Sequence, residues 1–499
     1  MSSCNKVTRR RKTQKHKKKY NIKYNIKNGG KAVDAGSYGC VFMPALKCKN
    51  NAIPYDRDKV SKLMYKKNAT YEMKEYEKIK KIVQHIPNYD KYFLLSGVTQ
   101  CDEPAPLQPA DLENFDETCK LFMKGDNDIN KTTVNANLDK LSIINMPNGG
   151  ISIEKFYTTL VSEPNEIKRL KLFEFINTRL IELLKNGITP LNKLNYNHCD
   201  IKSDNILLGR DNNVRLIDWG LSYENDGKTI PELIKNNLIH FNIPFSILFF
   251  NDGIKDLIQS VFLKIKMSTS KLNINIAQAE IMKIISMYII NELMGSHNTS
   301  HYEMIINEIM NNVYRLFNLT SSHNQIIDYS IISNSVVVEY IQAVLLKYVD
   351  ETGIFKDTKY YYEVFTKNAD LWGFVLTYLP LIENGNDVLL PKDVALGIGR
   401  IILKYCYSSE FAAKPIDVNV LITELLSLNK IIEFKSSIRM RRVYKKKTLK
   451  IPVLNKSIRS YSNNSAIKLE ADASADPVLS TSTISLKLNK SARAHSQKI

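Results

Sequence analysis

Two short polar motifs on either side of an apolar hairpin constrain this chain more than any other feature. The first motif is His-Cys-Asp-Ile-Lys-Ser-Asp-Asn at 198–205, and the second is Asp-Trp-Gly at 218–220. Apolar runs at 206–208 and 214–217 surround the turn-forming sequence Gly-Arg-Asp-Asn-Asn, which predicts two buried strands joined by a tight turn. Such a hairpin returns the second motif to the first. The sequence therefore predicts one site with four polar residues: Asp200, Lys202, Asn205 and Asp218.

This set of side chains suits the transfer of a phosphoryl group from a metal-bound nucleotide. That chemistry needs a residue to orient the attacking hydroxyl and charges to neutralise the transferred group. Asp200 is the candidate for the first role, and Lys202 is the candidate for steadying the transferred group. Asn205 and Asp218 are the candidate metal ligands. A solvated polar loop is the alternative, since Asp and Asn are common in turns, but the two flanking strands argue against it.

The two motifs resemble the protein kinase family. Asp200, Lys202 and Asn205 match the catalytic loop of that family, and 218–220 matches its metal-binding Asp-Phe-Gly, with Trp in place of Phe. The resemblance implies ATP and Mg²⁺ at the site. It also implies an α+β, bilobal protein-kinase-like fold with a small β-rich N-lobe and a large helical C-lobe. Lys202, two positions after the catalytic Asp, resembles the branch that phosphorylates Ser and Thr hydroxyls of protein substrates.

A glycine-containing segment upstream resembles the loop that covers the ATP phosphates in kinases. It reads Asp-Ala-Gly-Ser-Tyr-Gly-Cys-Val at 34–41, and Asp34 stands where the family usually has its first Gly. Glycine matters there because a Cβ would obstruct the approach of backbone N–H groups to phosphate oxygens. An ordinary hairpin turn is the alternative. The resemblance assigns nucleotide contacts to Gly36, Ser37, Tyr38, Gly39 and Val41.

The next segments resemble the strand and helix that anchor the nucleotide in kinases. Lys62, in Val-Ser-Lys at 60–62, is the expected phosphate-anchoring lysine, and 46–54 is the expected enlarged hairpin loop before it. A helix expected from about 70 to 83 offers three candidate partner acids: Glu72, Glu75 and Glu77. We expect Glu75 to pair with Lys62, because two isoleucines follow it on nearly the same helical face, and Glu72 is the reserve.

Two further apolar segments are expected strands, one at 92–95 and one at 141–146 that leads into Pro-Asn-Gly-Gly. By position in the series, the second resembles the kinase hinge, whose backbone groups hydrogen-bond adenine. The resemblance places Ile144 at the back of the nucleotide pocket, and Asn145 and Met146 beside the base.

The segment 369–376 resembles the start of the central helix of the large kinase lobe, whose Asp hydrogen-bonds the catalytic-loop backbone. Here that residue is Asp370, which lies much farther beyond Asp218 than in ordinary kinases, so that about a hundred residues, 251–356, are inserted. Helical periodicity predicts helices in this insertion, at 274–293, 302–316 and 326–348. Their apolar faces are expected to pack on one another or on the large lobe, with a groove for a partner as the alternative.

Two departures from the family concern regulation and subfamily. Cys199 occupies the position where many kinases carry an Arg that receives an activation-loop phosphate, and without a guanidinium that switch has no receptor. We therefore expect constitutive activity or control by a partner. The segment 240–249 stands in place of the usual Ala-Pro-Glu. Together with the insertion, it resembles the divergent serine/threonine protein kinases encoded by large nucleocytoplasmic DNA viruses.

Charge divides the 499 residues into a core and two tails. Residues 1–31 carry twelve Lys and Arg and no acid, and 435–499 carry fifteen against three acids, whereas the remainder is slightly acidic. We therefore expect disordered basic tails at 1–29 and 435–499, an N-lobe at 30–148 and a C-lobe at 149–434. The tails are candidates for binding nucleic acid, acidic proteins or lipid surfaces, with a purely solubilising role as the alternative.

Seven scattered cysteines without metal-ligand spacing favour a reducing, intracellular compartment, such as host cytoplasm, a virion or the nucleus. No apolar stretch approaches membrane-spanning length, so no integral membrane segment is expected. Three function classes compete: an active serine/threonine protein kinase, a small-molecule phosphotransferase of the aminoglycoside or choline kinase type, and a pseudokinase scaffold. Lys202 and the 370–373 motif favour the first over the second. Asp34 and the missing Ala-Pro-Glu suggest the pseudokinase scaffold. The retained metal and phosphate ligands favour the active kinase over that scaffold.

Overall fold

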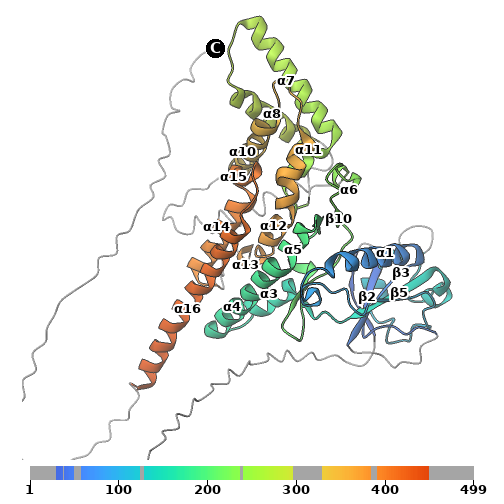
Figure 1. Cartoon of the computed structure of the whole chain (residues 1–499). Coiled ribbons are helices and arrows are strands. Elements are labelled where there is room, and N and C mark those ends of the chain that lie inside the picture. The colour runs from blue at the N-terminus through green and yellow to red at the C-terminus, as the bar shows by residue number, and fades with distance from the viewer. Residues whose placement is uncertain are drawn as a thin grey trace, which may run out of the picture. The chain divides into compact units, whose positions relative to one another are not determined.

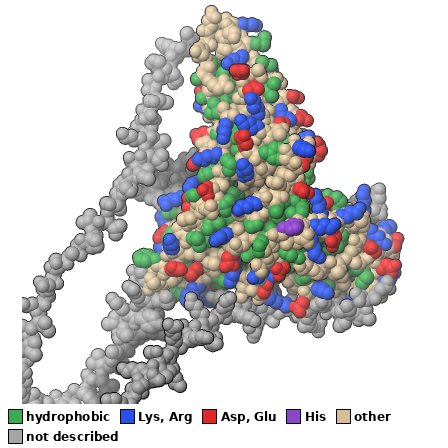
Figure 2. Space-filling view, in the orientation of Figure 1, with side chains coloured by type: hydrophobic (Ala, Val, Ile, Leu, Met, Phe, Trp, Pro, Cys, Tyr) green, Lys and Arg blue, Asp and Glu red, His purple; other side chains and the backbone are tan. Residues whose placement is uncertain are grey.

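The computed structural model describes most of the chain, namely residues 30–36, 39–49, 58–123, 128–236, 240–295, 329–383 and 390–448. The predicted α+β class is confirmed, because an antiparallel sheet forms one part of the protein and helices form most of the rest (Figure 1). Figure 2 shows Lys and Arg interspersed with Asp and Glu on the face toward the viewer. This mixed surface agrees with a core whose charges nearly balance.

The large sheet has the strand order β1-β2-β3-β5-β4, and every neighbouring pair in it is antiparallel. Its strands are β1 (Lys31–Ala35), β2 (Gly39–Met43), β3 (Lys59–Tyr65), β4 (Thr99–Cys101) and β5 (Leu141–Pro147). The register sets Lys62 on the central strand β3 opposite Val41 on β2 and Ile144 on β5. Because directly paired residues point to the same side of a sheet, these three side chains share one face.

Helix α1 (Lys66–Val83) begins directly after β3 and lies along one face of the sheet (Figure 1). The expected helix is confirmed, although it begins four residues before position 70. Its buried residues Ala69, Ile79 and Val83 lie at helical spacing. Ala69 packs with Met64 and Ile144 of the sheet, so α1 covers the face to which Lys62 points.

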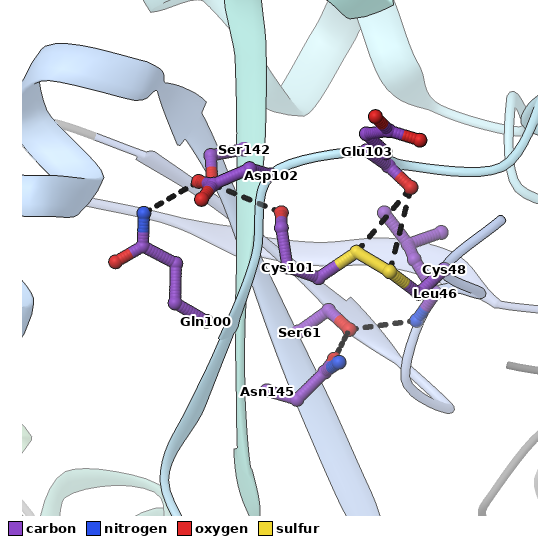
Figure 3. Close-up of a disulfide and its surroundings, with 9 residues drawn as sticks. All are labelled: Leu46, Cys48, Ser61, Gln100, Cys101, Asp102, Glu103, Ser142 and Asn145. Carbon is purple, nitrogen blue, oxygen red and sulfur yellow. Dashed lines mark hydrogen bonds between the residues drawn. A yellow bond between two sulfur atoms is a disulfide. The ribbon is translucent and has the colours of Figure 1, made fainter. Parts of the chain in front are cut away.

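The opposite face of the sheet is covered by the segment between β4 and β5. This cover contains α2 (Phe115–Thr118) and 3₁₀ turns at Lys120–Met123, Val134–Ala136 and Leu138–Lys140. Phe115 packs on Phe42 of β2, with ring centroids 6.2 Å apart. Two disulfides tie the cover and its neighbouring loops to the sheet: Cys40–Cys119 and Cys48–Cys101, the second drawn in Figure 3.

These disulfides change the inference drawn from the cysteines. Four of the seven cysteines are paired, across sequence separations of 79 and 53 residues. Separations of that size have no recognisable spacing pattern, which is why the sequence did not predict the pairs. The expectation of a reducing compartment depended on unpaired cysteines, and the structure removes that support.

The rest of the described chain is mainly helical. Its α-helices outside the segment 251–356 are α3 (Ile153–Val161), α4 (Glu166–Leu183), α5 (Thr189–Lys193), α6 (Glu232–Lys235), α11 (Asp357–Tyr360), α12 (Thr366–Leu376), α13 (Pro380–Glu383), α14 (Lys392–Cys406), α15 (Ser409–Ala412) and α16 (Val418–Thr448). Two small sheets join them, β6-β8-β9 (Ile151–Ser152, Ile206–Leu208, Val214–Leu216) and β7-β10 (Tyr196–Asn197, Tyr223–Glu224). The predicted hairpin is confirmed as β8 and β9. Helix α12 is buried at every position from Asn368 to Leu376, which makes it the centre of this part.

The segment 251–356, the expected insertion, is helical where the structure describes it, as its periodicity predicted. The expected helices at 274–293 and 326–348 are confirmed as α8 (Gln278–Gly295) and α10 (Tyr329–Tyr348), and 302–316 lies outside the described residues. A further helix, α7 (Asp252–Leu272), was not predicted. Buried Ile285, Ile289, Ile341 and Val344 belong to the same apolar cluster as the α12 core. The interpretation of these stripes as core is therefore confirmed.

Two predicted boundaries were wrong. The apolar run 92–95 is not a strand: Phe93 makes a single bridge with Leu216, and the edge strand is β4, a few residues later. The expected tail at 435–499 begins too early, because α16 continues to Thr448. Its last turns are rich in Lys and Arg, which are good helix formers. Within the described residues, no helix combines the length and apolarity needed to cross a membrane.

Candidate active site

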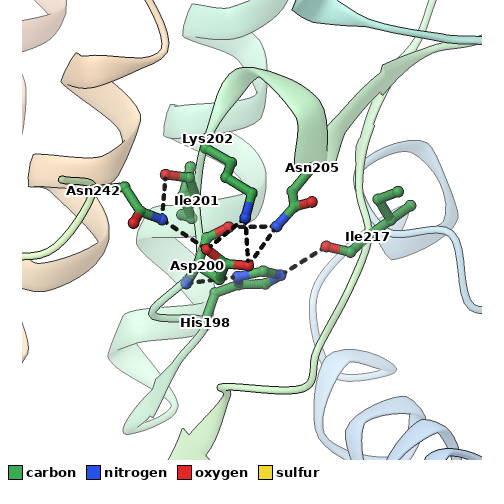
Figure 4. Close-up of polar contacts among 7 residues, drawn as sticks. All are labelled: His198, Asp200, Ile201, Lys202, Asn205, Ile217 and Asn242. Carbon is green, nitrogen blue, oxygen red and sulfur yellow. Dashed lines mark hydrogen bonds and ion pairs between the residues drawn. The ribbon is translucent and has the colours of Figure 1, made fainter. Parts of the chain in front are cut away.

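His198, the first residue of the motif at 198–205, fixes the loop between β7 and β8. His198 is fully buried, and burial lowers its pKa below the ordinary value, so the ring is neutral near pH 7. Its Nδ1 accepts a hydrogen bond from the backbone N–H of Asp200 at 3.2 Å, so the ring proton is assigned to Nε2. Nε2 donates to the carbonyl oxygen of Ile217 at 3.0 Å (Figure 4). One imidazole therefore joins the two motifs.

The carboxylate of Asp200 is held by donors from three places in the chain (Figure 4). Lys202 Nζ lies 3.2 and 3.1 Å from its two oxygens. Asn205 donates from its side chain to Oδ2 at 2.7 Å, and Asn242 donates to Oδ1 at 2.8 Å. The predicted grouping of Asp200, Lys202 and Asn205 is thus present, with the carboxylate oriented on both sides.

Asn242 is a site residue that sequence reasoning missed. It is buried, and its side chain also contacts the carbonyl of Ile201 at 3.4 Å. In the sequence, the segment around it differs from the kinase pattern only in lacking Ala-Pro-Glu. Nothing local connects Asn242 with a carboxylate 42 residues earlier. Only the return of the chain past the loop could have revealed the contact.

The predicted role of Asp370 as an acceptor for the backbone of the loop at 198–205 is confirmed. Its side chain is 1% exposed and accepts hydrogen bonds from the backbone N–H groups of His198 and Cys199, the latter at 2.8 Å. The same helix approaches the loop closely at Gly373. A Cβ there would lie 2.5 Å from the carbonyl oxygen of Ile201, so only glycine fits. Helix α12 therefore sets the position of the loop.

Asp218 combines an unusual backbone with an exposed carboxylate. Its φ is 64°, in the left-handed region that non-glycine residues rarely adopt, and such residues concentrate at functional sites. The N–H of Ile217 donates to the carbonyl of Asn205 at 3.0 Å, which holds Asp218 beside the loop. Among the described residues, none forms a hydrogen bond or ion pair with the Asp218 carboxylate. The Asp218 carboxylate therefore has a fixed position beside the loop but no positively charged partner among the described residues.

Lys62 pairs with Glu72 and not with the expected Glu75. The Lys62 Nζ atom lies 2.7 Å from Glu72 Oε2, and the two side chains are 16% and 21% exposed. The reserve candidate was therefore correct. Glu72 is seven positions before buried Ile79, so both lie on the face that α1 turns toward the sheet. Glu75 is one turn further along the helix, near Tyr196.

Tyr76 connects this pair with the second motif. Burial raises its pKa above the ordinary value, and the negative charges of Glu72 and Asp218 raise it further. Both carboxylates are thus close enough to act on one hydroxyl. The Glu72 and Asp218 carboxylates therefore act electrostatically on the same side chain.

The glycine-containing segment between β1 and β2 lies next to Lys62. The N–H of Gly36 donates to the carbonyl of Gly39 at 2.9 Å, and Ser37 and Tyr38 lie outside the described residues. A Cβ on Gly39 would lie 2.9 Å from Lys62 Cγ, whereas a Cβ on Gly36 would meet nothing within 4 Å. Gly39 is required by packing, and Gly36 faces open space. Asp34 forms an ion pair with Lys155 of α3, with an N–O distance of 3.5 Å.

The expected base contacts on β5 are placed on two different faces. Met146 packs with Met64 and Ile144, on the Lys62 face. The side chain of Asn145 points to the other face, where it accepts a hydrogen bond from Ser61 at 2.5 Å beside the disulfide (Figure 3). Strand alternation turns the Asn145 side chain away from the Lys62 face, and the expected contact of its backbone with the base stays a prediction. Its backbone lies between Ser61 of β3 and Thr99 of β4, its partners in the sheet.

No protein-family model matches this sequence, and the curated proteins also contain no match. The assignment of a function therefore depends on the geometry of the site.

Proposed function

We propose that this chain is an ATP- and Mg²⁺-dependent protein kinase that phosphorylates Ser and Thr hydroxyls. In this proposal the five-stranded sheet with α1 is the small lobe of a bilobal kinase-like fold, and the helical part is the large lobe. The observation that carries the proposal is the oriented carboxylate of Asp200, held by Lys202, Asn205 and Asn242 next to unneutralised Asp218.

The donor set fits a magnesium ion shared with a nucleotide. Mg²⁺ is usually bound by one or two carboxylates together with substrate phosphates, not by a cage of protein ligands. The described residues contain no group of three or more His, Cys, Asp and Glu side chains that could hold a metal ion by itself. Asp218 has a free carboxylate, and Asn205 uses its side-chain N–H groups on Asp200, which leaves its oxygen for a metal. When bound, Mg²⁺ supplies positive charge to the outer phosphates.

The contacts of Asp200 suggest how the chain's own residues share the work. A carboxylate offers about four lone-pair positions, and Lys202, Asn205 and Asn242 fill them with four contacts. A substrate hydroxyl needs one of these contacts to open. Lys202 is 30% exposed, whereas both asparagines are buried, so Lys202 is the donor that moves. It then faces the transferred phosphoryl group while the asparagines hold Asp200 to accept the hydroxyl proton.

A direct test compares Asp200→Ala with Asp204→Ala. Asp204 lies in the same loop, is exposed, and has no hydrogen bond or ion pair with any described residue, so it is a matched control. Purified full-length protein is incubated with Mg-ATP and a generic protein substrate, and phosphosites are mapped by mass spectrometry. We expect Ser and Thr phosphorylation by the wild type and by Asp204→Ala. Asp200→Ala should lose about two to four decades in rate, the usual contribution of a positioned proton acceptor.

Two other outcomes would replace the proposal. Binding of ATP without any transfer would favour a scaffold, and transfer only to a small metabolite would favour a small-molecule phosphotransferase. Equal rates for the wild type and Asp200→Ala would show that the phosphorylation came from a contaminating kinase.

A further inference from the structure

The segment that follows Asp218 is held to the catalytic loop by hydrogen bonds between neutral groups. We call residues 219–229 the post-218 segment. Within it, β10 pairs with β7, the strand that enters the catalytic loop. Directly after β10, the N–H of Asn225 donates to the carbonyl of Asn195 at 2.7 Å. The backbone alone therefore fastens the middle of the post-218 segment.

A buried side-chain relay adds to this attachment. The hydroxyl of Tyr361 donates to Asn225 Oδ1 at 2.6 Å, and Asn225 Nδ2 donates to Asn197 Oδ1 at 2.7 Å. Asn197 Nδ2 in turn donates to the carbonyl of Thr366 at 2.7 Å. All three relay side chains are at most 9% exposed. Burial also raises the pKa of Tyr361, so its hydroxyl keeps its proton and stays a donor.

The source of Tyr361 is itself unusual. It begins a π-helical turn (Tyr361–Phe365) between α11 (Asp357–Tyr360) and α12. Such turns are rare and occur often at functional sites. The next residue, Tyr362, donates to the carbonyl of Thr229 at 2.9 Å, at the end of the post-218 segment. One irregular turn thus holds the segment at two points and continues into the helix that carries Asp370.

The residue at position 199 offers no charge that could hold the post-218 segment to the loop. Cys199 is 1% exposed, and burial raises the pKa of its thiol well above the usual value, so the side chain is neutral. A phosphate on the post-218 segment would find no cation at this position. The relay residue Tyr361 also meets β10 directly, since the Tyr223 ring of that strand stacks on the Tyr361 ring with centroids 6.5 Å apart.

We propose that Tyr361 and Asn225 are positioning residues that hold the post-218 segment in its working arrangement, so that the chain needs no phosphate there. This inference rests on the proposed kinase function. It assigns a role in the phosphotransfer rate to a turn outside the segment 251–356, acting through Asn225.

The test compares Tyr361→Phe with Tyr378→Phe in the full-length protein after phosphatase treatment. Tyr378 is the matched control, because its buried hydroxyl also donates to an asparagine, Asn177, at 2.7 Å, but away from the post-218 segment. The measurements are kcat, KM for ATP, thermal stability, and amide hydrogen exchange of peptides that cover 219–229. Both variants should lose similar thermal stability.

We expect Tyr361→Phe to lower kcat on the order of tenfold, the factor that corresponds to one lost buried hydrogen bond, with little change in KM. Its 219–229 peptides should exchange faster. Tyr378→Phe should keep wild-type kcat and exchange in 219–229, and phosphatase should leave wild-type activity unchanged.

Three results would overturn the inference: equal loss of kcat in both variants, wild-type exchange of 219–229 in Tyr361→Phe, or loss of wild-type activity on phosphatase treatment. If the wild type transfers no phosphate at all, the proposed function fails. The exchange comparison then still decides whether Tyr361 holds the segment.

Discussion

Replacing Glu72 by Gln should impair nucleotide use far more than replacing Glu75 by Gln. Both residues lie on α1, both are partly buried, and both substitutions remove one charge without changing the shape of the side chain. Only Glu72 contacts Lys62, at 2.7 Å. Glu75 forms no hydrogen bond or ion pair with any described residue. The two variants therefore differ in one interaction.

The expected size follows from the burial of the pair. A hydrogen bond to a charged group contributes about 1.5–3 kcal/mol. The Lys62 and Glu72 side chains are 16% and 21% exposed, so water screens the pair in part and the lower half of that range applies. A loss of about 1.5–2 kcal/mol corresponds to about 10- to 30-fold in kcat/KM for ATP. Glu75→Gln should change kcat/KM for ATP less than about threefold, because Glu75 has no partner among the described residues to lose.

The assay is steady-state phosphotransfer at varied ATP, with each substitution repeated in a Lys62→Met background. If Glu72 acts through Lys62, the Glu72→Gln effect should largely disappear there, because a double-mutant cycle isolates the pairwise interaction. An equal effect with and without Lys62 would refute the reasoning. So would a larger loss from Glu75→Gln than from Glu72→Gln.

Three further outcomes follow from the site. Asn242→Ala should lower kcat about 10- to 100-fold in the phosphotransfer assay, because Asp200 loses a buried donor at 2.8 Å, and an unchanged kcat would contradict this role. Gly373→Ala should destabilise the protein by about 1–3 kcal/mol in urea unfolding, because the new Cβ would lie 2.5 Å from a backbone oxygen that cannot rotate away. Burial lowers the pKa of His198, so the unfolded chain binds the proton more tightly than the folded chain. The resulting stability is complete above pH about 6.5 and declines as the pH falls below it, by at most about 1.4 kcal/mol per pH unit. His198→Gln should flatten that part of the pH dependence of urea unfolding.

Local patterns were sufficient for the centre of the site. The loop with Asp200, Lys202 and Asn205 and the hairpin β8-β9 depend on short-range sequence: polar residues at a turn, then two apolar strands. The contact of Asp370 with the loop was also predicted, from its resemblance to the family's helix. These features need only the order of segments along the chain.

Contacts that depend on how distant elements are oriented were not predictable in the same way. Helical periodicity identified the buried face of α1 but not which turn of that face meets Lys62. That choice is set by the junction at Tyr65 and Lys66, where β3 passes into α1 without a loop. The disulfides and the Asn242 contact likewise join residues more than 40 positions apart. Neither the disulfide pairs nor the contact between Asn242 and Asp200 corresponds to a recognisable pattern in a single sequence.

The segment 251–356, which the kinase resemblance implies is an insertion, is placed so that it leaves the site undisturbed. Its two ends lie side by side: the Phe249 and Phe355 rings stack with centroids 4.8 Å apart, and Lys255 pairs with Asp357 at 2.9 Å. A segment whose ends are adjacent can be added to a fold without moving the elements on either side. The side chains that hold Asp200 and the loop at 198–205 come from residues before 251 or after 356: Lys202, Asn205, Asn242 and Asp370. The long separation between Asp218 and Asp370 in sequence is therefore compatible with the short hydrogen bonds between α12 and the loop.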